Sequence, residues 1–458
     1  MNRIAGRASA VLLLIAALLT GLIFFLCEYF MEAENWAIFS GSPHIYDSQT
    51  GRLDNYYATD RDGILLLDLR DGHSFAPDEL ARKAALHWTG DREGNVSVPF
   101  YAHYTEELAG FDILNGIYAY GNPGANIRMT LSSRIQAVAL EAMGGFKGTV
   151  AVMNYETGEI LCAVSTPTFD PEAAPEITKE NEDQWEGVYL NRFTQTCYVP
   201  GSIFKIVTAA AALEELPGIE EMTFTCAGSY EFGVDKVTCE AVHGTLDIKA
   251  AFAHSCNCAF AQIALLLGQE KLDKYVRQFG ITESVSFDGI TTAQGSVALE
   301  NTADVELAWS AIGQHKDQIN PCRYLTFLAA IARDGIEVTP HVIEEISIGT
   351  QKTYSAGEGR EKRIMSVTTA KTLQEYMLNN VRTIYGADKF QGFTAGGKSG
   401  TAEVGGGLKP NALFTGFLQD KEYPLAFIAV AENGGYGSTT CIPILSKVLA
   451  ACREELRG

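Results

Sequence analysis

The feature that most constrains this 458-residue chain is an apolar run near its N-terminus, residues 8–27, which contains no Asp, Glu, Lys or Arg. At about 1.5 Å of rise per residue, a helix of this length matches the hydrocarbon thickness of a bilayer, about 30 Å. A cleaved secretory signal has a shorter apolar region and ends in small residues, unlike Leu26-Cys27-Glu28. We therefore expect an uncleaved membrane anchor.

The charges beside this run predict its orientation. Arg3 and Arg7 precede it, and acidic residues follow it from Glu28 onward. Basic flanks stay in the cytoplasm, so we expect residues 1–27 to form a cytoplasmic tail and a single transmembrane helix of the cell membrane. The bulk of the chain would then be extracytoplasmic. The alternative is lipid attachment at Cys27, although the residue before it is larger than such sites carry.

The formal net charge of −21 argues against a nucleic-acid partner, because phosphate binding needs clustered Lys and Arg. The ten cysteines include no C-x-x-C pair, and Cys256-Asn-Cys258 is too tight for a zinc knuckle, so we expect no metal site and no cofactor. Cys226 and Cys239 flank a short polar segment. They are expected either to form a disulfide, which an extracytoplasmic location permits, or to remain free thiols.

The remaining chain divides into two regions. Residues 28–126 are polar and rich in turn signals, such as those at 47–51 and 60–63, which predicts a small pedestal domain. Residues 127–458 carry strand-like runs at both ends and helical runs between them, which predicts an α+β domain whose antiparallel sheet is assembled from the two ends. The expected strands are Thr149–Met153, Ile160–Val164, Thr394–Glu403, Ala412–Leu418 and Leu425–Ala431; the expected helices are Ser132–Ala142, Phe204–Leu216, Ile248–Leu267, Ala303–Arg333 and a last one from about Leu445.

The first candidate motif is Ser202-Ile-Phe-Lys205, which follows a helix-stopping Pro-Gly pair and opens a strongly apolar helical run. A serine at a helix N-terminus lies where unpaired N–H groups favour a developing oxyanion. Lys205, three residues later, projects from the same face and is in reach of the Ser202 hydroxyl. With its pKa lowered by burial or by a nearby cation, Lys205 can act as the base. The alternative is a capping serine beside a solvated lysine.

The second motif, Ser255-Cys-Asn257, interrupts two apolar segments. In an extended or tightly turned backbone, residues two apart point the same way, so Ser255 and Asn257 are expected to face the site together while Cys256 points away. Taken alone, a Ser-x-Asn pair is a weak signal.

The third motif, Lys398-Ser399-Gly400-Thr401, lies in a glycine-rich strand. Glycine in a strand often marks the close approach of a ligand or another backbone. Lys398 supplies positive charge for a carboxylate, Ser399 and Thr401 supply hydroxyl groups, and the Thr401 N–H is a second oxyanion donor. An edge strand or bulge is the structural alternative.

Residues 392–399 also match the phosphate-loop pattern G-x-x-x-x-G-K-[ST]. That pattern requires a helix directly after it, and the glycines at 405–407 oppose a helix there.

In this order, the three motifs resemble the S-x-x-K, S-D-N and K-T-G signature of penicillin-binding proteins and class A β-lactamases. From about residue 126 onward the chain resembles a class B penicillin-binding protein, and its short pedestal resembles the penicillin-binding protein A subgroup. The departures are Cys256 and Ser399, and neither removes a functional group. The segments that carry the resemblance beyond the motifs are Gly148–Val152, Thr157–Ala163, Thr168–Pro171, Asn191-Arg192, Tyr198–Lys205, His243-Gly244, Ile312–Gln314, Asp60–Gly63 and Glu106–Gly110.

The resemblance implies a penicillin-binding transpeptidase fold, similar to the serine β-lactamases, with an antiparallel sheet flanked by helices. It implies a serine-type D-Ala-D-Ala transpeptidase that cross-links peptidoglycan stem peptides and binds β-lactams covalently. A glycan polymerase of the SEDS type in the membrane is the implied partner. As implied catalytic residues, Ser202 is the nucleophile and Lys205 its base, with Ser255 as the proton relay. Asn257 would hold the donor amide, and Lys398, Ser399, Gly400 and Thr401 would bind the terminal carboxylate.

Two other functions are compatible with the same motifs. A D,D-carboxypeptidase or β-lactamase would pass the acyl group to water, and a class A β-lactamase would need a deacylating glutamate, for which Glu283 and Glu300 are the candidates. A non-catalytic penicillin-binding scaffold for a glycan polymerase is the second. A β-lactam sensor is disfavoured, because the expected tail of seven residues leaves no room for a cytoplasmic effector.

Overall fold

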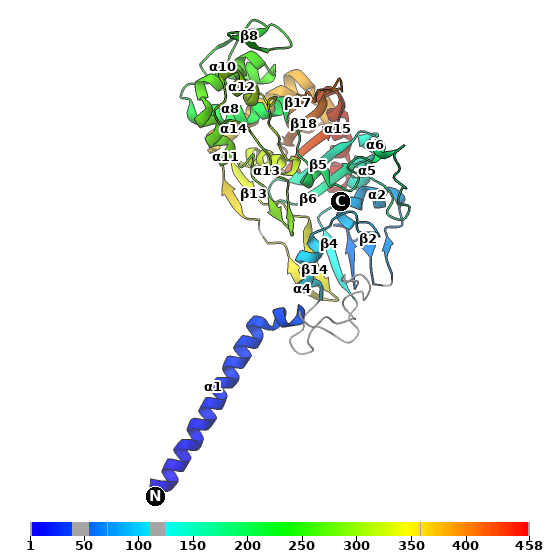
Figure 1. Cartoon of the computed structure of the whole chain (residues 1–458), viewed down its shortest axis with the longest axis vertical. Helices are drawn as coiled ribbons and strands as arrows, with labels where there is room; N and C mark the ends of the chain where they lie inside the picture. The colour runs from blue at the N-terminus through cyan, green and yellow to red at the C-terminus, as the bar shows by residue number, and fades with distance from the viewer. Residues whose placement is uncertain (1, 39–54, 71, 110–123, 358, 457–458) are drawn as a thin grey trace.

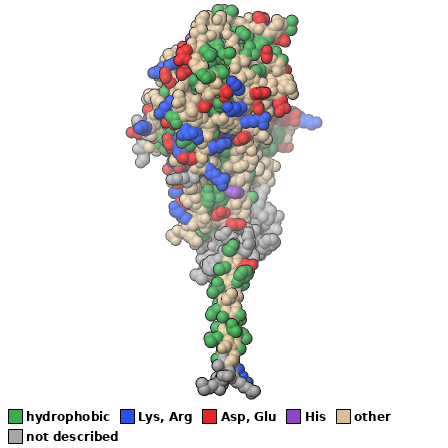
Figure 2. Space-filling view, turned by 90° about the vertical axis from the view of Figure 1, so that its left-hand side faces the viewer, with side chains coloured by type: hydrophobic (Ala, Val, Ile, Leu, Met, Phe, Trp, Pro, Cys, Tyr) green, Lys and Arg blue, Asp and Glu red, His purple; other side chains and the backbone are tan. Residues whose placement is uncertain are grey.

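The computed structural model describes residues 2–38, 55–70, 72–109, 124–357 and 359–456. Its first element is the helix α1 (Asn2–Ile38), which extends from the body of the molecule as a long stalk (Figure 1). Within it, residues 6–29 have a mean hydropathy of 2.9 and none of this stretch is buried against the protein. Figure 2 shows the stalk covered by apolar side chains. The helix is thus long and apolar enough for the expected single-pass anchor.

Next to the stalk lies the pedestal, a six-stranded sheet of order β15-β14-β4-β1-β2-β3 (Figure 1). Its strands are β1 (Tyr56–Thr59), β2 (Leu65–Asp68), β3 (Ser74–Phe75), β4 (Ala125–Met129), β14 (Ile343–Ile348) and β15 (Gln351–Ser355). Two of the strands come from the C-terminal half of the chain and β4 crosses residue 126, so the pedestal is not the contiguous segment 28–126. The helices α2 (Glu79–Thr89), α3 (Phe100–His103) and α4 (Thr105–Ala109) complete it. The turn expected at 47–51 lies outside the described residues.

The central sheet is antiparallel, of order β17-β18-β19-β5-β6, and joins the two ends of the domain as the sequence predicts. Its strands are β5 (Gly148–Asn154), β6 (Ile160–Thr166), β17 (Ala395–Ala402), β18 (Asn411–Leu418) and β19 (Leu425–Ala431). Successive residues face opposite sides: Val150 and Val152 pack with α5 (Ser133–Met143) and α15 (Gly437–Leu456), whereas Ala151 packs with the remaining helices. Because both faces are buried, β5, β6, β18 and β19 have largely apolar sequences without strict alternation.

On the other face lies a helical layer built around α8 (Lys205–Glu215). Its remaining elements are α7 (Arg192–Gln195), η1 (Gly201–Phe204), α9 (Ile248–Ala253), α10 (Asn257–Leu267), α11 (Gln269–Gln278), α12 (Asp304–Ala311), α13 (Pro321–Ala332) and α14 (Val367–Asn380). The short elements η2 (Val381–Tyr385) and η3 (Ala387–Phe390) pack instead on the face covered by α5 and α15. The short helix α6 (Glu182–Trp185) belongs to neither layer, and its Trp185 packs against a separate small apolar cluster. Short strand pairs are formed by β11 (Ser286–Phe287) with β12 (Ile290–Thr291), and by β13 (Ile336–Val338) with β16 (Glu361–Arg363).

Three of the predicted helices differ from the structure: two are each divided into two helices, and one begins earlier than predicted. The run Ile248–Leu267 is two helices, because Ser255 has φ +53° and Cys256 caps a new helix by accepting a hydrogen bond from the Ala259 N–H. The run Ala303–Arg333 is likewise broken, between α12 and α13, where Gly313 has φ +76°. The last helix begins at Gly437, eight residues before the predicted start, and includes Pro443.

A small β-structured segment, residues 224–246, covers one end of α10, and we call it the flap. It consists of β7 (Phe224–Cys226), β8 (Ser229–Phe232), β9 (Asp235–Thr238) and β10 (Gly244–Leu246), paired as β10-β7 and β8-β9. Figure 1 shows β8 at the end of the molecule opposite the N-terminal stalk.

Candidate active site

Ser202 lies in the turn η1 that leads directly into α8, so the predicted position at a helix start is correct. The preceding Gly201 has φ +55°, and a Cβ on it would lie 2.5 Å from the Thr401 carbonyl oxygen. Only glycine therefore fits both this conformation and this contact. The result is that the Ser202 turn lies directly against strand β17, which carries the third motif.

Lys205 joins the first motif to the second. Its Nζ lies 3.1 Å from Ser202 Oγ and 3.1 Å from Ser255 Oγ. It also lies 2.6 Å from the Ser255 carbonyl oxygen and 2.7 Å from Asn257 Oδ1. The two latter oxygens can only accept hydrogen bonds, so they engage two N–H groups of the lysine. On a neutral amine, these contacts leave the nitrogen lone pair for the Ser202 hydroxyl proton.

The surroundings of Lys205 favour this neutral amine. The residue is fully buried, whereas Ser202 is only partly buried. Burial, together with the charge of Lys398, lowers the pKa of Lys205 from 10.5 to about 7. A base whose pKa lies near neutrality is suited to remove a proton in the reaction and to return it later.

Ser255 lies between two lysines. Lys398 Nζ is 3.0 Å from Ser255 Oγ and 3.0 Å from the Ser399 carbonyl oxygen. Lys398 is also fully buried, and burial lowers its pKa to about 7. A continuous chain of contacts therefore runs from Ser202 through Lys205 and Ser255 to Lys398, along which a proton can be passed.

Asn257 has its amide held at both ends. Its Oδ1 faces Lys205, and its Nδ2 donates a hydrogen bond of 2.8 Å to the Thr238 carbonyl oxygen of the flap. As predicted, Ser255 and Asn257 share a direction while Cys256 is turned away, toward the flap.

Strand β17 brings the third motif beside the nucleophile. It is the outermost strand of the central sheet, so among the strands that the structure describes one of its edges has no partner. A Cβ on Gly400 would lie 2.8 Å from the Pro200 carbonyl oxygen, which explains the glycine at this point of the motif. Ser399 and Thr401, both partly buried, flank that glycine.

Two residues from other parts of the chain position this strand, and the sequence did not reveal their role. Tyr385 lies in η2, and its hydroxyl is 3.0 Å from Ser399 Oγ and accepts a hydrogen bond from the Ser399 N–H. Gln314, known only as part of a resembling segment, donates from Nε2 to the Thr401 carbonyl oxygen at 2.8 Å. The bond from Gln314 fixes the strand at the end of the motif.

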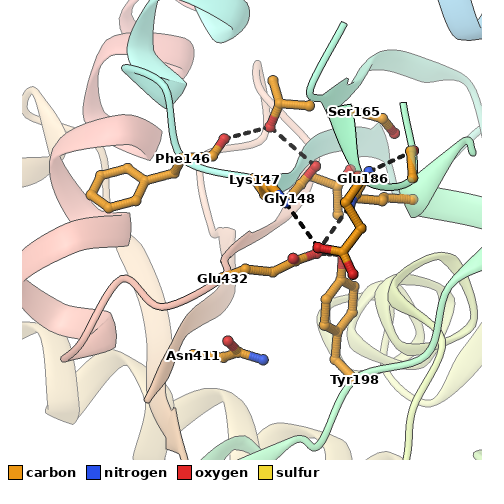
Figure 3. A network of polar contacts seen from close by, with 12 residues as sticks. Phe146, Lys147, Gly148, Ser165, Glu186, Tyr198, Asn411 and Glu432 are labelled. Atoms are coloured by element: carbon orange, nitrogen blue, oxygen red, sulfur yellow. Dashed lines mark hydrogen bonds and ion pairs between the residues drawn. The ribbon is translucent and has the colours of Figure 1, made fainter. Parts of the chain in front are cut away.

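The chain segment that leads to Ser202 is held by a buried polar network. Tyr198 donates its hydroxyl to Glu432 Oε1 at 2.9 Å, and Arg192 Nε lies 2.9 Å from the same oxygen. Figure 3 shows Glu432, which follows β19, extending toward Tyr198. Because Arg192 is 5 % exposed, its pairing with Glu432 avoids an unpaired buried charge.

The rival interpretations find less support in the geometry. Residues 395–402 continue as a strand rather than opening a helix, so the phosphate-loop match is accidental. Among the hydrogen bonds of the described residues, none joins Glu283 or Glu300 to Ser202, Lys205 or Ser255.

The fold and the arrangement of Ser202, Lys205 and Ser255 define a class: serine acyltransferases that use a lysine base. A family model described as "Penicillin binding protein transpeptidase domain" matches residues 148–450. The chain belongs to this penicillin-binding protein transpeptidase family.

Individual relatives agree with this assignment. The chain is 29% identical over 362 residues to the peptidoglycan D,D-transpeptidase PbpA of Mycolicibacterium smegmatis, which covers 72% of this chain and 73% of that protein. The D,D-transpeptidase domain of a peptidoglycan glycosyltransferase from Eggerthella lenta superposes with a TM-score of 0.75 at 25% identity, covering 88% of this chain and 98% of that one. A chain of a peptidoglycan synthase complex, described as coordinating polymerization and crosslinking, superposes with a TM-score of 0.62 at 26% identity, covering 72% and 63%.

Proposed function

We propose that this chain is a membrane-anchored peptidoglycan D,D-transpeptidase that works through an acyl-enzyme on Ser202. The observation that carries the proposal is the contact of 3.1 Å between Ser202 Oγ and the buried Lys205 amine. The relative named PbpA is called a peptidoglycan D,D-transpeptidase, which supports the same substrate class.

In the first half-reaction, Ser202 Oγ attacks the carbonyl carbon between the two terminal D-alanines of a donor stem peptide. Lys205 accepts the hydroxyl proton, and the N–H groups of Ser202 and Thr401 stabilise the oxyanion. The C–N bond then breaks, and the proton reaches the leaving D-alanine nitrogen through Lys205 and Ser255. The products are an ester on Ser202 and free D-alanine.

In the second half-reaction, an amine from a neighbouring stem peptide attacks the ester. Lys205 accepts one proton from this amine and returns a proton to Ser202 Oγ as the ester bond breaks. A new amide bond joins the two stems, and the enzyme is regenerated. Water in place of the amine would give the carboxypeptidase or β-lactamase reaction.

The third motif suits the donor's terminal carboxylate. Lys398 contributes a positive charge beside Ser255, and the Ser399 and Thr401 hydroxyl groups can donate hydrogen bonds. Gly400 allows the strand to lie next to the Ser202 turn. Asn257, held by Lys205 and by the Thr238 carbonyl group, is positioned to bind the donor amide. β-Lactams offer the same carbonyl and carboxylate and would acylate Ser202.

The orientation and the partner are part of the proposal. Arg3 and Arg7, which lie in α1 just before its apolar run, favour a cytoplasmic N-terminus and an extracytoplasmic catalytic domain. The stalk supports a partner in the membrane, and the similar chain in a peptidoglycan synthase complex supports a glycan polymerase in that role. A C-terminal alkaline phosphatase fusion should be active, which would not occur with the opposite orientation.

Fluorescent penicillin labelling tests the nucleophile. The full-length chain in detergent should be labelled covalently and stoichiometrically, whereas Ser202→Ala should take up no label. Ser286→Ala, on the exposed side of β11, is the matched control and should be labelled like the unsubstituted chain. Equal labelling of Ser202→Ala would overturn the assignment.

A further inference from the structure

Three cysteines and a histidine converge behind the second motif. Cys226, Cys239, His243 and Cys256 each offer one ligand atom, and these four atoms lie within 4.8 Å of one another. Three of the residues belong to the flap, and Cys256 belongs to the second motif. Within the described residues, they form the one such group of metal-binding side chains.

The distances fit a tetrahedral metal site. His243 Nδ1 lies 3.5 Å from Cys226 Sγ and 3.5 Å from Cys239 Sγ, and Cys239 Sγ lies 4.0 Å from Cys256 Sγ. Around a tetrahedral Zn²⁺ with Zn–S of about 2.3 Å and Zn–N of about 2.0 Å, the ligand atoms are about 3.5 Å (S to N) and about 3.8 Å (S to S) apart. Three of the six distances between ligand atoms therefore match those expected around one bound ion, and the other three are no longer than 4.8 Å.

We propose that these four side chains bind one Zn²⁺ as a structural Cys₃His site. Three sulfur ligands and one nitrogen complete four-coordination, which leaves no position for water or substrate, so the ion is not itself catalytic. Binding takes the three cysteines as thiolates and His243 as the neutral ring through Nδ1, and the thiol protons are released to solvent. No oxidant or reductant is needed.

The flap has a small hydrophobic core, so a bound ion would add substantially to its stability. Most of its side chains are exposed, and Val234 is fully exposed at the tip between β8 and β9. Only a few apolar residues, among them Phe224 and Val237, are buried beneath it. A segment of this size with so small a core is commonly held by a metal or by disulfides. Cys226 and Cys239 are free thiols in the structure, which is the second of the two alternatives expected for this pair.

The site also acts on the catalytic residues through the chain. Cys256 lies between Ser255 and Asn257, and its Sγ caps α10 through the Ala259 N–H. Cys239 directly follows Thr238, whose carbonyl oxygen holds the Asn257 amide. Cys256 is therefore part of the second motif itself, and Cys239 is adjacent in sequence to the residue that holds Asn257. The ion serves as a positioning element for Ser255 and Asn257.

From the sequence we expected no metal site, and the spacing of the four ligands explains the difference. The ligands are separated by 13, 4 and 13 residues along the chain (226 to 239, 239 to 243 and 243 to 256). Only the Cys239-x-x-x-His243 pair has a familiar metal-binding interval. Cys256 was considered together with Cys258, whereas the fold pairs it with the flap.

Metal analysis of the full-length chain tests the proposal. The chain is purified in detergent without chelator, and its zinc content is measured by inductively coupled plasma mass spectrometry. We expect about one zinc per chain. Replacement by Co²⁺ should give the intense thiolate-to-cobalt absorption and the tetrahedral d–d bands of a Cys₃His site. A chain without metal, whose mass is lower by two hydrogens because Cys226 and Cys239 are bridged, would overturn the proposal.

Variants separate the ligands from their neighbours. Cys226→Ala and His243→Ala should lose zinc, whereas Cys258→Ala, which removes a buried cysteine of α10 outside the four, should keep it. Loss of zinc from Cys258→Ala with retention in Cys226→Ala would contradict the ligand assignment. Ser202→Ala should retain zinc, so failure of the proposed function and failure of the metal site are distinguishable.

The positioning role has its own measurement. Removal of zinc by a chelator should slow acylation by a fluorescent penicillin about 10-fold or more, and added Zn²⁺ should restore the rate, because small displacements of catalytic groups are costly. Limited proteolysis should show cleavage of the flap only in the zinc-free chain. An unchanged acylation rate in a chain shown to be free of zinc would refute the positioning role.

Discussion

Lys205 and Lys398 contact the same hydroxyl group: their Nζ atoms lie 3.1 and 3.0 Å from Ser255 Oγ. Both lysines are fully buried, so two positive charges at this spacing would be costly. The arrangement favours a state that carries one positive charge, in which the neutral amine serves as base and the charged one binds a carboxylate. The single charge of this pair is the main electrostatic property of the site.

This property predicts a bell-shaped pH profile for acylation by a penicillin. Below about pH 7, Lys205 becomes protonated and cannot accept the Ser202 proton; above about pH 7, Lys398 loses the charge that attracts the carboxylate. Because Lys205 and Lys398 both contact Ser255, their protonation is coupled. The two apparent pKa values of the profile therefore belong to the pair of lysines and not to either residue alone. The Glu240 carboxylate raises the pKa of both lysines, and Cys239 and Cys256 raise that of Lys205.

Second-order acylation rates measured across this pH range give the profile. Lys398→Arg keeps a permanent charge, so its alkaline limb should disappear while the acid limb remains. A flat profile in the unsubstituted chain would contradict the assignment of Lys205 as base.

Lys205→Arg separates charge from basicity. A guanidinium keeps the positive charge but cannot accept the Ser202 proton. We expect the acylation rate to fall about 10²- to 10⁴-fold, the usual contribution of a general base. Stopped-flow measurement with a chromogenic cephalosporin provides the rate, and circular dichroism checks the fold. A rate within a factor of a few of the original would exclude Lys205 as the base.

Gly400→Ala tests the contact between the third motif and the nucleophile turn. The added Cβ would meet the Pro200 carbonyl oxygen at 2.8 Å and Ile203 Cγ2 at 3.1 Å. Strand β17 must then move away from Ser202, and we expect acylation to slow by about 100-fold. Gly357→Ala, where a Cβ meets nothing within 4 Å, is the control. Equal rates in the two variants would show that this contact is not required.

Tyr385→Phe removes the hydroxyl group that contacts both Ser399 Oγ and the Ser399 N–H. As a positioning residue, Tyr385 should affect recognition of the donor carboxylate more than the chemical step. We expect KM to rise several-fold with little change in kcat. Its effect should also be smaller in a Ser399→Ala background, because the two residues act through one contact. Full additivity in this double-mutant cycle would show that the residues act independently.

The sequence was sufficient for the parts of the fold that depend on local pattern. The continuous apolar runs of β5, β6, β18 and β19 reflect a sheet buried on both faces, and the three motifs are local in sequence. The helix break at Ser255 was missed, because apolar composition on both sides hides a single residue with φ +53°. The role of Tyr385 and the cluster of Cys226, Cys239, His243 and Cys256 depend on contacts between segments that are distant in sequence. No local sequence pattern encodes such contacts.

Product analysis tests the central claim most directly. The full-length chain is incubated with a polymerised glycan substrate carrying pentapeptide stems, and the products are identified by mass spectrometry. We predict released D-alanine together with an amide cross-link between two stems, both abolished in Ser202→Ala. Release of D-alanine with only hydrolysed tetrapeptide stems, at acceptor concentrations that sustain cross-linking by other transpeptidases, would contradict the account and identify the chain as a hydrolase.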